Sequence, residues 1–301
     1  MIKQFVQVAF DKLLSPEVKH RSERIILLIA IASYLLHLSV ILLNNLNFLQ
    51  LESKFFQNPI AAIYTPFSFI LVYEVYLLIF FLPKSISSYI GKQYEIILLI
   101  VIRRIFKDLA HLELSTEWFA IQDDLQFTYD VLTALLLFFL IFYFYKNIEK
   151  KTGAPRQESE SERRDKSRFI LLKNGIAVLL VPLLIVLAIH SLATWGYTVL
   201  MDYQEGMAAF KNINNIFFDD FFSVVIIVDV LLLLASFFYS DQFHKIIRNS
   251  GFVISTILIK VSFSVEGLVN NALIIGAVTF GFLILLIHNK FARNHAQEGE
   301  A

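Results

Sequence analysis

Apolar residues are gathered into long stretches, and shorter polar segments separate them. A helix needs about 20 apolar residues to cross roughly 30 Å of hydrocarbon, and several stretches reach that length. We therefore predict an all-α, polytopic membrane protein with eight crossings. They lie at about 25–43, 60–82, 94–110, 127–145, 174–194, 221–239, 252–265 and 268–287. The third and seventh crossings are the weakest, because each is short and contains basic residues.

The N-terminal segment, 1–24, has a different pattern. Apolar residues recur at helical spacing with polar residues on the other side, which is typical of an amphipathic helix lying at a membrane surface. Charged residues fill much of 11–24 and no small-residue cleavage site follows, so we do not expect a cleavable signal peptide. The apolar positions are Ile2, Phe5, Val6, Phe10, Leu13 and Leu14.

The distribution of basic residues predicts the orientation. If all eight segments cross, 20 of the 26 Lys and Arg residues fall on the side of the two termini, eight of them within 146–168. The positive-inside rule makes that side cytoplasmic and favours a bacterial inner or plasma membrane. The charge-rich segment 146–168 is expected to be a flexible linker. It separates the predicted membrane halves 25–145 and 169–288, and 289–301 forms a cytoplasmic tail.

Ionisable residues inside the predicted crossings follow the same order in both halves. The first half has His37, Glu74 and then Arg103 with Arg104, and the second half has His190, Asp229 and Lys260. The intervals are 37 and 29 residues in the first half, and 39 and 31 in the second. Because each half has four crossings, this order predicts two tandem four-helix halves that form a parallel pseudo-repeat.

Depth estimates predict how these charges pair. At 1.5 Å of rise per residue, Glu74 lies level with Arg103, and Asp229 lies level with Lys260. We expect each acid to face its base across a neighbouring helix, and Arg104 to pair with Asp108. Charges buried in a membrane are costly and often mark ion or proton pathways, but salt bridges that fix helix packing are the alternative.

Acidic residues dominate the predicted outer side. Together with the few basic residues there, they give that side a net charge of about −9, and the inner side has about +8. Such a surface concentrates cations, although topology alone also depletes it of basic residues. The candidate outer vestibule contains Asp123, Asp124, Asp219 and Asp220, with Glu113 and Glu117 nearby.

Composition and motifs narrow the functional classes. The chain is 57% hydrophobic, has a mean hydropathy of +0.64, and contains no cysteine, which excludes disulfides and thiolate metal sites. It has no phosphate-binding glycine loop and no serine-nucleophile motif, so we expect no enzyme, metal, cofactor or nucleic-acid partner. A four-helix unit with an acid in its second helix and arginines in a later one resembles a voltage-sensor domain in outline. The fourth crossing at 127–145, however, has no basic residue and therefore no ladder of gating charges.

These patterns favour movement of a cation or proton through the membrane, as a channel or a proton-coupled transporter. Glu74 and Asp229 are then the binding groups, with Arg103, Arg104 and Lys260 competing for them and the two histidines leading outward. The alternative is a membrane scaffold whose salt bridges are structural. Small residues spaced four apart in 268–287 permit close helix contact, within the chain or in a homo-oligomer. They are Ala272 with Gly276, and Ala277 with Gly281.

Overall fold

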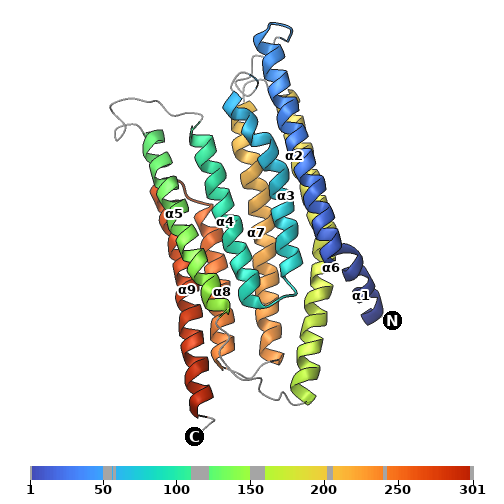
Figure 1. Ribbon diagram of the computed structural model, residues 1–301, viewed down its shortest axis with the longest axis vertical. Helices are drawn as coiled ribbons and strands as arrows, with labels where there is room; N and C mark the ends of the chain where they lie inside the picture. The colour runs from blue at the N-terminus through green and yellow to red at the C-terminus, as the bar shows by residue number, and fades with distance from the viewer. Residues whose placement is uncertain are drawn as a thin grey trace.

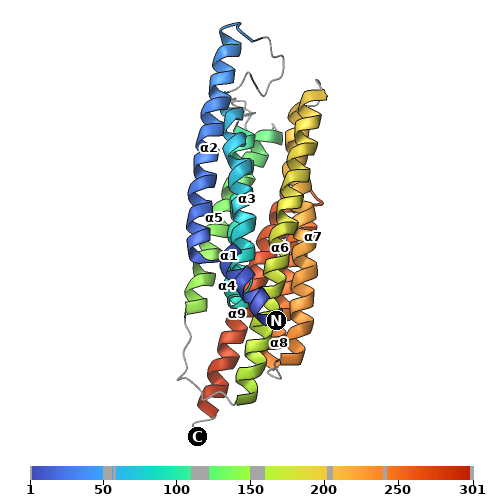
Figure 2. The same ribbon diagram turned by 90° about the vertical axis from the view of Figure 1, so that its right-hand side faces the viewer.

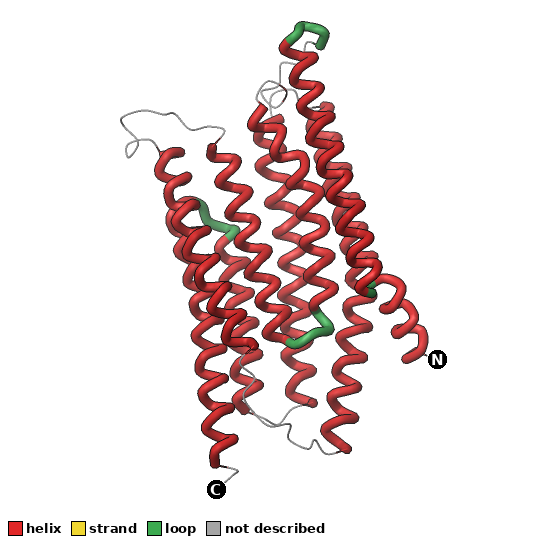
Figure 3. Tube along the Cα trace, in the orientation of Figure 1, coloured by secondary structure: helices red, strands yellow, loops and turns green. Residues whose placement is uncertain are grey.

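A computed structural model describes residues 2–49, 56, 59–109, 122–149, 160–201, 206–239 and 243–298. Within these residues the protein is all-α, and its long helices run up and down in one bundle (Figures 1 and 3). The elements are α1 (Ile2–Leu13), α2 (Pro16–Asn45), η2 (Pro59–Ile63), α3 (Tyr64–Phe81), α4 (Ile86–Leu109), α5 (Gln122–Glu149), α6 (Glu160–Met201), α7 (Gly206–Tyr239), α8 (Phe243–Ser262) and α9 (Gly267–Glu298).

Five helices are long and apolar enough to cross a membrane, which confirms the predicted fold class at that level. They comprise Lys3–Asn45, Asp124–Ile148, Arg163–His190, Asp220–Phe238 and Gly267–Asn294. Large apolar side chains on these helices face outward, as the hydrocarbon of a bilayer requires, and examples are Leu36 on α2, Phe138 on α5 and Phe238 on α7. α3 is apolar but shorter. α4 and α8 are not among the five, because both carry polar and charged residues.

Helix contacts follow the same order on both sides of the chain midpoint. In the first half α2 packs against α3, α3 against α4, and α4 against α5; in the second half α6 packs against α7, α7 against α8, and α8 against α9. α5 contacts α9, α3 contacts α6, and α4 contacts α8, so these pairs join the two halves. α1 lies outside the bundle against α6 (Figure 2).

α4 and α8 run lengthwise beside the apolar helices, and their polar faces are buried. Gln93, Tyr94, Ser255 and Thr256 are all fully shielded from solvent. A buried polar side chain is costly unless it finds a hydrogen-bond partner, so these side chains must bond within the bundle. This arrangement explains why the predicted crossings at 94–110 and 252–265 contain polar residues. The helices that contain these crossings begin eight or nine residues earlier than predicted.

The ends of several elements differ from the predicted bounds. The segment 1–24 contains two elements, since α1 ends at Leu13 and α2 begins at Pro16, where the hydroxyl of Ser15 accepts the Val18 amide at 3.2 Å. Tyr76 on α3 donates to the carbonyl of Leu13 at 3.0 Å and fixes this corner. The predicted flexible linker is helical at both ends, because α5 continues to Glu149 and α6 begins at Glu160.

One close contact depends on a glycine of α9. A Cβ at Gly281 would lie 1.8 Å from the hydroxyl oxygen of Tyr94. That hydroxyl is 2.8 Å from Ser255 Oγ, which in turn donates to the carbonyl of Ala277 at 2.7 Å. Ala277 and Gly281 therefore pack within the chain against α4 and α8, whereas a Cβ at Gly276 would meet no other atom within 4 Å.

Replacing Gly281 should weaken the bundle. Gly281→Ala forces the Tyr94 hydroxyl away from Ser255, and overpacking of this kind costs about 1–3 kcal/mol. We expect a clear fall in the midpoint of thermal unfolding in detergent. Gly276→Ala lies on the same helix with open space around it and should be neutral or stabilising, by at most about 1 kcal/mol. Equal effects of the two substitutions would contradict the proposed contact.

Candidate functional site

Among the described residues, two clusters of buried polar side chains lie at different depths along α4. Asp229 is the centre of one cluster, and Arg104 with Asp130 forms the centre of the other. Gln93 and Arg104, which lie in different clusters, are separated by 11 residues of α4, or roughly 16 Å of helical rise. Each cluster joins helices from both halves of the chain, so both contribute to the fold. The two clusters differ in charge, because Asp130 is paired with a basic residue and Asp229 has neutral hydrogen-bond partners.

Asp229 is buried on α7 and is held by neutral groups. Gln93 on α4 donates from Nε2 to Asp229 Oδ2 at 3.0 Å, and Thr256 on α8 donates to Gln93 Oε1 at 2.7 Å. The Tyr89 hydroxyl, one turn before Gln93, is a further hydrogen-bonding neighbour of the carboxyl group. Three helices thus converge on one acid.

No described residue forms an ion pair with Asp229. A basic residue that interacts electrostatically with Asp229 is Lys173 of α6. Lys173 is itself buried, and its Nζ donates to the carbonyl of Lys84. Lys84 lies in the turn between α3 and α4. Asp229 is therefore an acid in an apolar bundle without a basic ion-pair partner among the described residues, an arrangement that is costly while the carboxyl group stays charged.

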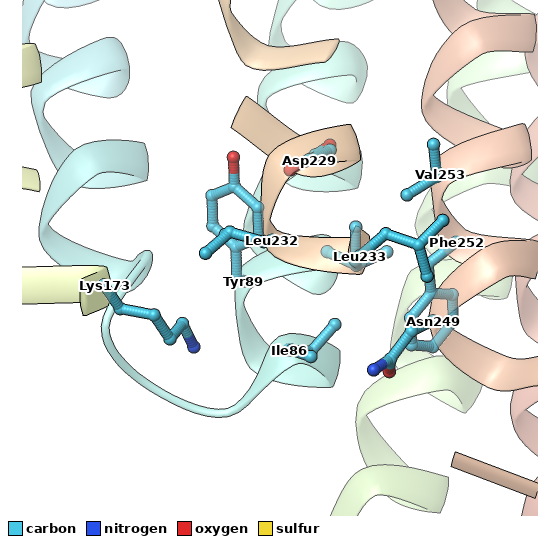
Figure 4. A pocket seen from close by; sticks show the side chains of 10 residues that line it. Ile86, Tyr89, Lys173, Asp229, Leu232, Leu233, Asn249, Phe252 and Val253 are labelled. Carbon is cyan, nitrogen blue, oxygen red and sulfur yellow. The ribbon is translucent and has the colours of Figure 1, made fainter. Parts of the chain in front are cut away.

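A small cavity lies beside this acid. It has a volume of about 20 Å³, which is room for about one water molecule. Figure 4 shows Lys173 on one side of it and Asn249 on the other, with Tyr89 and Asp229 between them. Most of the remaining lining is apolar and includes Leu232 and Phe252. The cavity lies toward the end of the bundle that carries the α3–α4 turn.

The second cluster is a saturated ion pair. Arg104 binds both carboxylate oxygens of Asp130 on α5, with Nη2 at 2.7 Å from Oδ1. Asp130 also accepts from Gln126 at 2.8 Å and from Asn271 at 2.7 Å. Arg104 further donates to Asn270, at 2.6 Å, and to Asn271 on α9. A bidentate ion pair that also bonds to α9 is suited to holding α4, α5 and α9 together.

An apolar layer separates the two clusters. Ile97 and Val101 of α4, Leu137 of α5 and Ile259 of α8 are fully buried, as is Val278 of α9. Tyr94 and Ser255 are the polar residues at the edge of this layer, and they bond to each other. The cavity beside Asp229 and a second one between the start of α8 and the end of α9 have volumes of about 20 and 40 Å³, and neither is lined by a residue of this layer. The layer therefore closes the interior between the two clusters in this conformation.

Two predicted pairings differ from the structure. Arg104 pairs with Asp130 and not with Asp108, and Asp229 has Gln93 and Tyr89 as partners in place of Lys260, which lies half-buried on α8. Helix rotation explains these differences, because a depth estimate fixes each residue's height and leaves its direction around the helix open.

Glu74 and Arg103 also differ from the predicted pairing. Glu74 is half-buried on α3, and the charged groups that act on it are Lys92 and Glu95. Arg103 is buried on α4, roughly two to three turns beyond these residues. The level placement of Glu74 and Arg103 assumes that the helix of Arg103 begins at Tyr94, whereas α4 begins at Ile86.

The two histidines occupy unlike surroundings. His37 is buried, its Nδ1 lies 2.7 Å from Thr65 Oγ1, and its ring meets Phe56 edge-on. His190 is exposed on α6. Their matching places in the sequence therefore do not produce matching environments, because His190 lies on the exposed side of α6 with Val186 and Ile189.

The predicted vestibule residues are also dispersed. Asp124 is completely buried near the start of α5, and Asp220 is exposed on α7. Asp123 and Asp219 lie on the same two helices, but their side chains are outside the described part of the structure, as are Glu113 and Glu117. Asp124 therefore does not contribute to an open acidic funnel, because its carboxylate is shielded from solvent.

Sequence reasoning missed several residues of both clusters. Asp130 lies near the start of the predicted crossing at 127–145, and Arg104 lies near the end of the preceding crossing at 94–110. Both positions are near the predicted outer side, so the sequence already places these two residues at similar depth. Neutral polar residues in apolar stretches are the other available signal, since bilayers disfavour them. They are Gln93, Thr256, Asn270 and Asn271.

Removing one member of the ion pair should destabilise the protein strongly. Arg104→Gln or Asp130→Asn leaves an uncompensated buried charge, which typically costs about 3–5 kcal/mol. The double variant removes both charges and should be more stable than the sum of the two losses predicts. Chemical unfolding in detergent measures all four proteins, and Arg164→Gln on the exposed start of α6 is the control. Additive losses would show that the two side chains do not interact.

Comparisons with protein-family models, with curated proteins and with solved structures found no match for this chain. The function must therefore be inferred from its own residues.

Proposed function

We propose that the chain crosses the membrane eight times, as two tandem four-helix halves. Support comes from α4 and α8, which have 24 and 20 residues and run alongside the apolar helices. Their polar faces are covered by neighbours, as a polar helix in hydrocarbon requires. The repeated order of helix contacts supports two related halves. The excess of basic residues supports cytoplasmic termini in a plasma or inner membrane.

Cysteine labelling can test this topology, because the chain has no cysteine of its own. Single substitutions at Lys84 and Lys245 probe the first ends of α4 and α8, and Ser115 and Ser264 probe the far ends. We expect a membrane-impermeant maleimide to label Ser115→Cys and Ser264→Cys from outside intact cells. Lys84→Cys and Lys245→Cys should react only after permeabilisation. Labelling of all four positions from one side would exclude crossing by α4 and α8.

For function, we infer that the protein moves protons, or a small cation, with Asp229 as the binding group. The observation that carries this inference is a buried carboxyl group with neutral hydrogen-bond donors and no ion pair among the described residues. Binding a proton or a cation relieves the cost of the buried charge. By contrast, Arg104 already neutralises Asp130, so that pair has no need of a mobile ion.

The geometry favours a transporter over an open channel. The cavity beside Asp229 extends toward Lys173, while the buried layer at Ile97, Val101 and Ile259 closes the other direction. A bound proton could therefore leave toward the Arg104 side only after the helices move. Alternating access of this kind is usual where two repeats enclose a central site. The candidates for the remainder of the pathway are Glu74, Arg103, Lys260, His37 and His190.

Asp229→Asn should abolish transport and leave the fold intact. Asparagine keeps an oxygen that can accept from Gln93, but it cannot bind a proton. We expect proton uptake into liposomes, followed with an enclosed pH-sensitive dye under an imposed potential, to fall to the level of empty vesicles. Asp165→Asn is the matched control and should transport normally, because this side chain lies near the start of α6 and is 43% exposed.

Two further outcomes distinguish the alternatives. If wild-type protein carries no protons, the same assay with Na⁺ and K⁺ gradients tests the cation form of the proposal. Unchanged flux in Asp229→Asn for an ion that the wild type does carry would refute the role of Asp229.

The second candidate is a membrane scaffold without transport, and the closed interior favours it. Both clusters consist of bonds between helices, and each would serve to fix their packing. A scaffold predicts no flux above empty vesicles for any ion, with lower thermal stability as the effect of Asp229→Asn. Either function is non-enzymatic. On α9, Ala272 and Gly276 are exposed and provide a surface through which two copies could associate.

A further inference from the structure

Arg248 lies at the end of the bundle where α8 begins and α9 ends, and its partners are neutral. Nε and Nη2 donate to Asn249 Oδ1 at 3.2 and 3.0 Å, and Nη1 lies 3.1 Å from His288 Nε2. No carboxylate among the described residues pairs with it. A guanidinium group has five N–H donors in a planar fork, so two donors are left for another acceptor.

The histidine beside Arg248 cannot serve as its counter-ion. His288 Nδ1 lies 3.1 Å from the carbonyl oxygen of His244, which can only accept. Nδ1 therefore carries the proton and Nε2 accepts from Arg248, which makes the ring neutral. The ring of His244 stacks on it with centroids 5.1 Å apart. The positive charge of Arg248 is thus left without an anion among the described residues.

A cavity of about 40 Å³ lies beside this arginine, between α8 and α9. Its walls are apolar apart from Arg248 and the two histidines. They include Ile247, Ile284, Ile287 and Phe291. Ile287 is 52% exposed and Phe291 is 49% exposed, so the cavity continues onto the apolar outer surface of the bundle. The site therefore combines a cationic end with an apolar groove.

The surrounding sequence is basic. The segments 243–253 and 283–294 contain Lys245, Lys290 and Arg293 in addition to Arg248, and neither contains an acidic residue. Lys245, Lys290 and Arg293 are exposed. The acids closest in sequence are Asp241 and Glu298, outside both segments. A negatively charged ligand is therefore attracted to this end of the helix pair.

We propose that this groove binds an anionic phospholipid, with the phosphate on Arg248 and an acyl chain along Ile247, Ile287 and Phe291. The phosphate supplies the missing anion, and its oxygens match the remaining N–H donors of the guanidinium group. Basic pockets between transmembrane helices on the cytoplasmic side are suited to such headgroups. A free phosphate would use only the cationic end and would leave the apolar groove empty.

Lipid titration of the purified full-length protein in neutral detergent tests the proposal. Phosphatidylglycerol should raise the thermal unfolding midpoint, and phosphatidylcholine with the same acyl chains should not. In Arg248→Gln we expect apparent affinity for phosphatidylglycerol to fall about five- to tenfold. Arg163→Gln, on the exposed start of α6, is the matched control and should bind like the wild type.

Two additional arms keep the result decisive if Arg248→Gln fails to fold. Ile287→Trp fills the groove from an exposed position, keeps the charge, and should reduce phosphatidylglycerol binding. Soluble glycerol 3-phosphate offers the headgroup without acyl chains and should not stabilise the protein at concentrations where the lipid does. Equal stabilisation by glycerol 3-phosphate, equal binding of both lipids, or full binding by Ile287→Trp would each overturn the lipid site.

Discussion

The structure depends on covering the polar faces of α4 and α8. Hydrocarbon offers no hydrogen-bond partner, so every polar side chain inside the bundle must bond to another part of the protein. Gln93 bonds to Thr256, Tyr94 bonds to Ser255, and Arg104 bonds to residues of α5 and α9. These bonds fix α4 against α8 and its neighbours. The more apolar helices then form much of the outer surface, which is largely apolar.

The two polar clusters satisfy this constraint in different ways. Arg104 and Asp130 neutralise each other, which gives rigidity, whereas Asp229 receives neutral donors beside a cavity with room for about one water molecule. If both acids served only in packing, each would be expected to have a basic partner. Asp229 has neutral donors instead, and for that reason the transport proposal rests on it. Asn249 borders the same cavity and accepts from Arg248, so one hydrogen bond connects the proposed lipid site to the surroundings of Asp229.

The sequence alone determined the all-α class with helices long and apolar enough to cross a membrane, the approximate positions of these helices, and the presence of the amphipathic helix at Ile2–Leu13. Apolar stretches of sufficient length suffice for this, because hydrocarbon thickness sets a helix length independently of any partner. The sequence also identified Asp229 and Arg104 as ionisable residues of the interior. It did so from their rarity in apolar stretches.

Only the tertiary structure decided which side chains meet. Pairing depends on the rotation of each helix about its axis and on the offset between neighbours, and both are set by packing such as the contact of Gly281 with Tyr94. For this reason Arg104 meets Asp130 and not Asp108, and His37 is buried while His190 is exposed. Counting residues gives height only where the ends of a helix are predicted correctly, which was not so for α4, and direction around a helix follows from its neighbours.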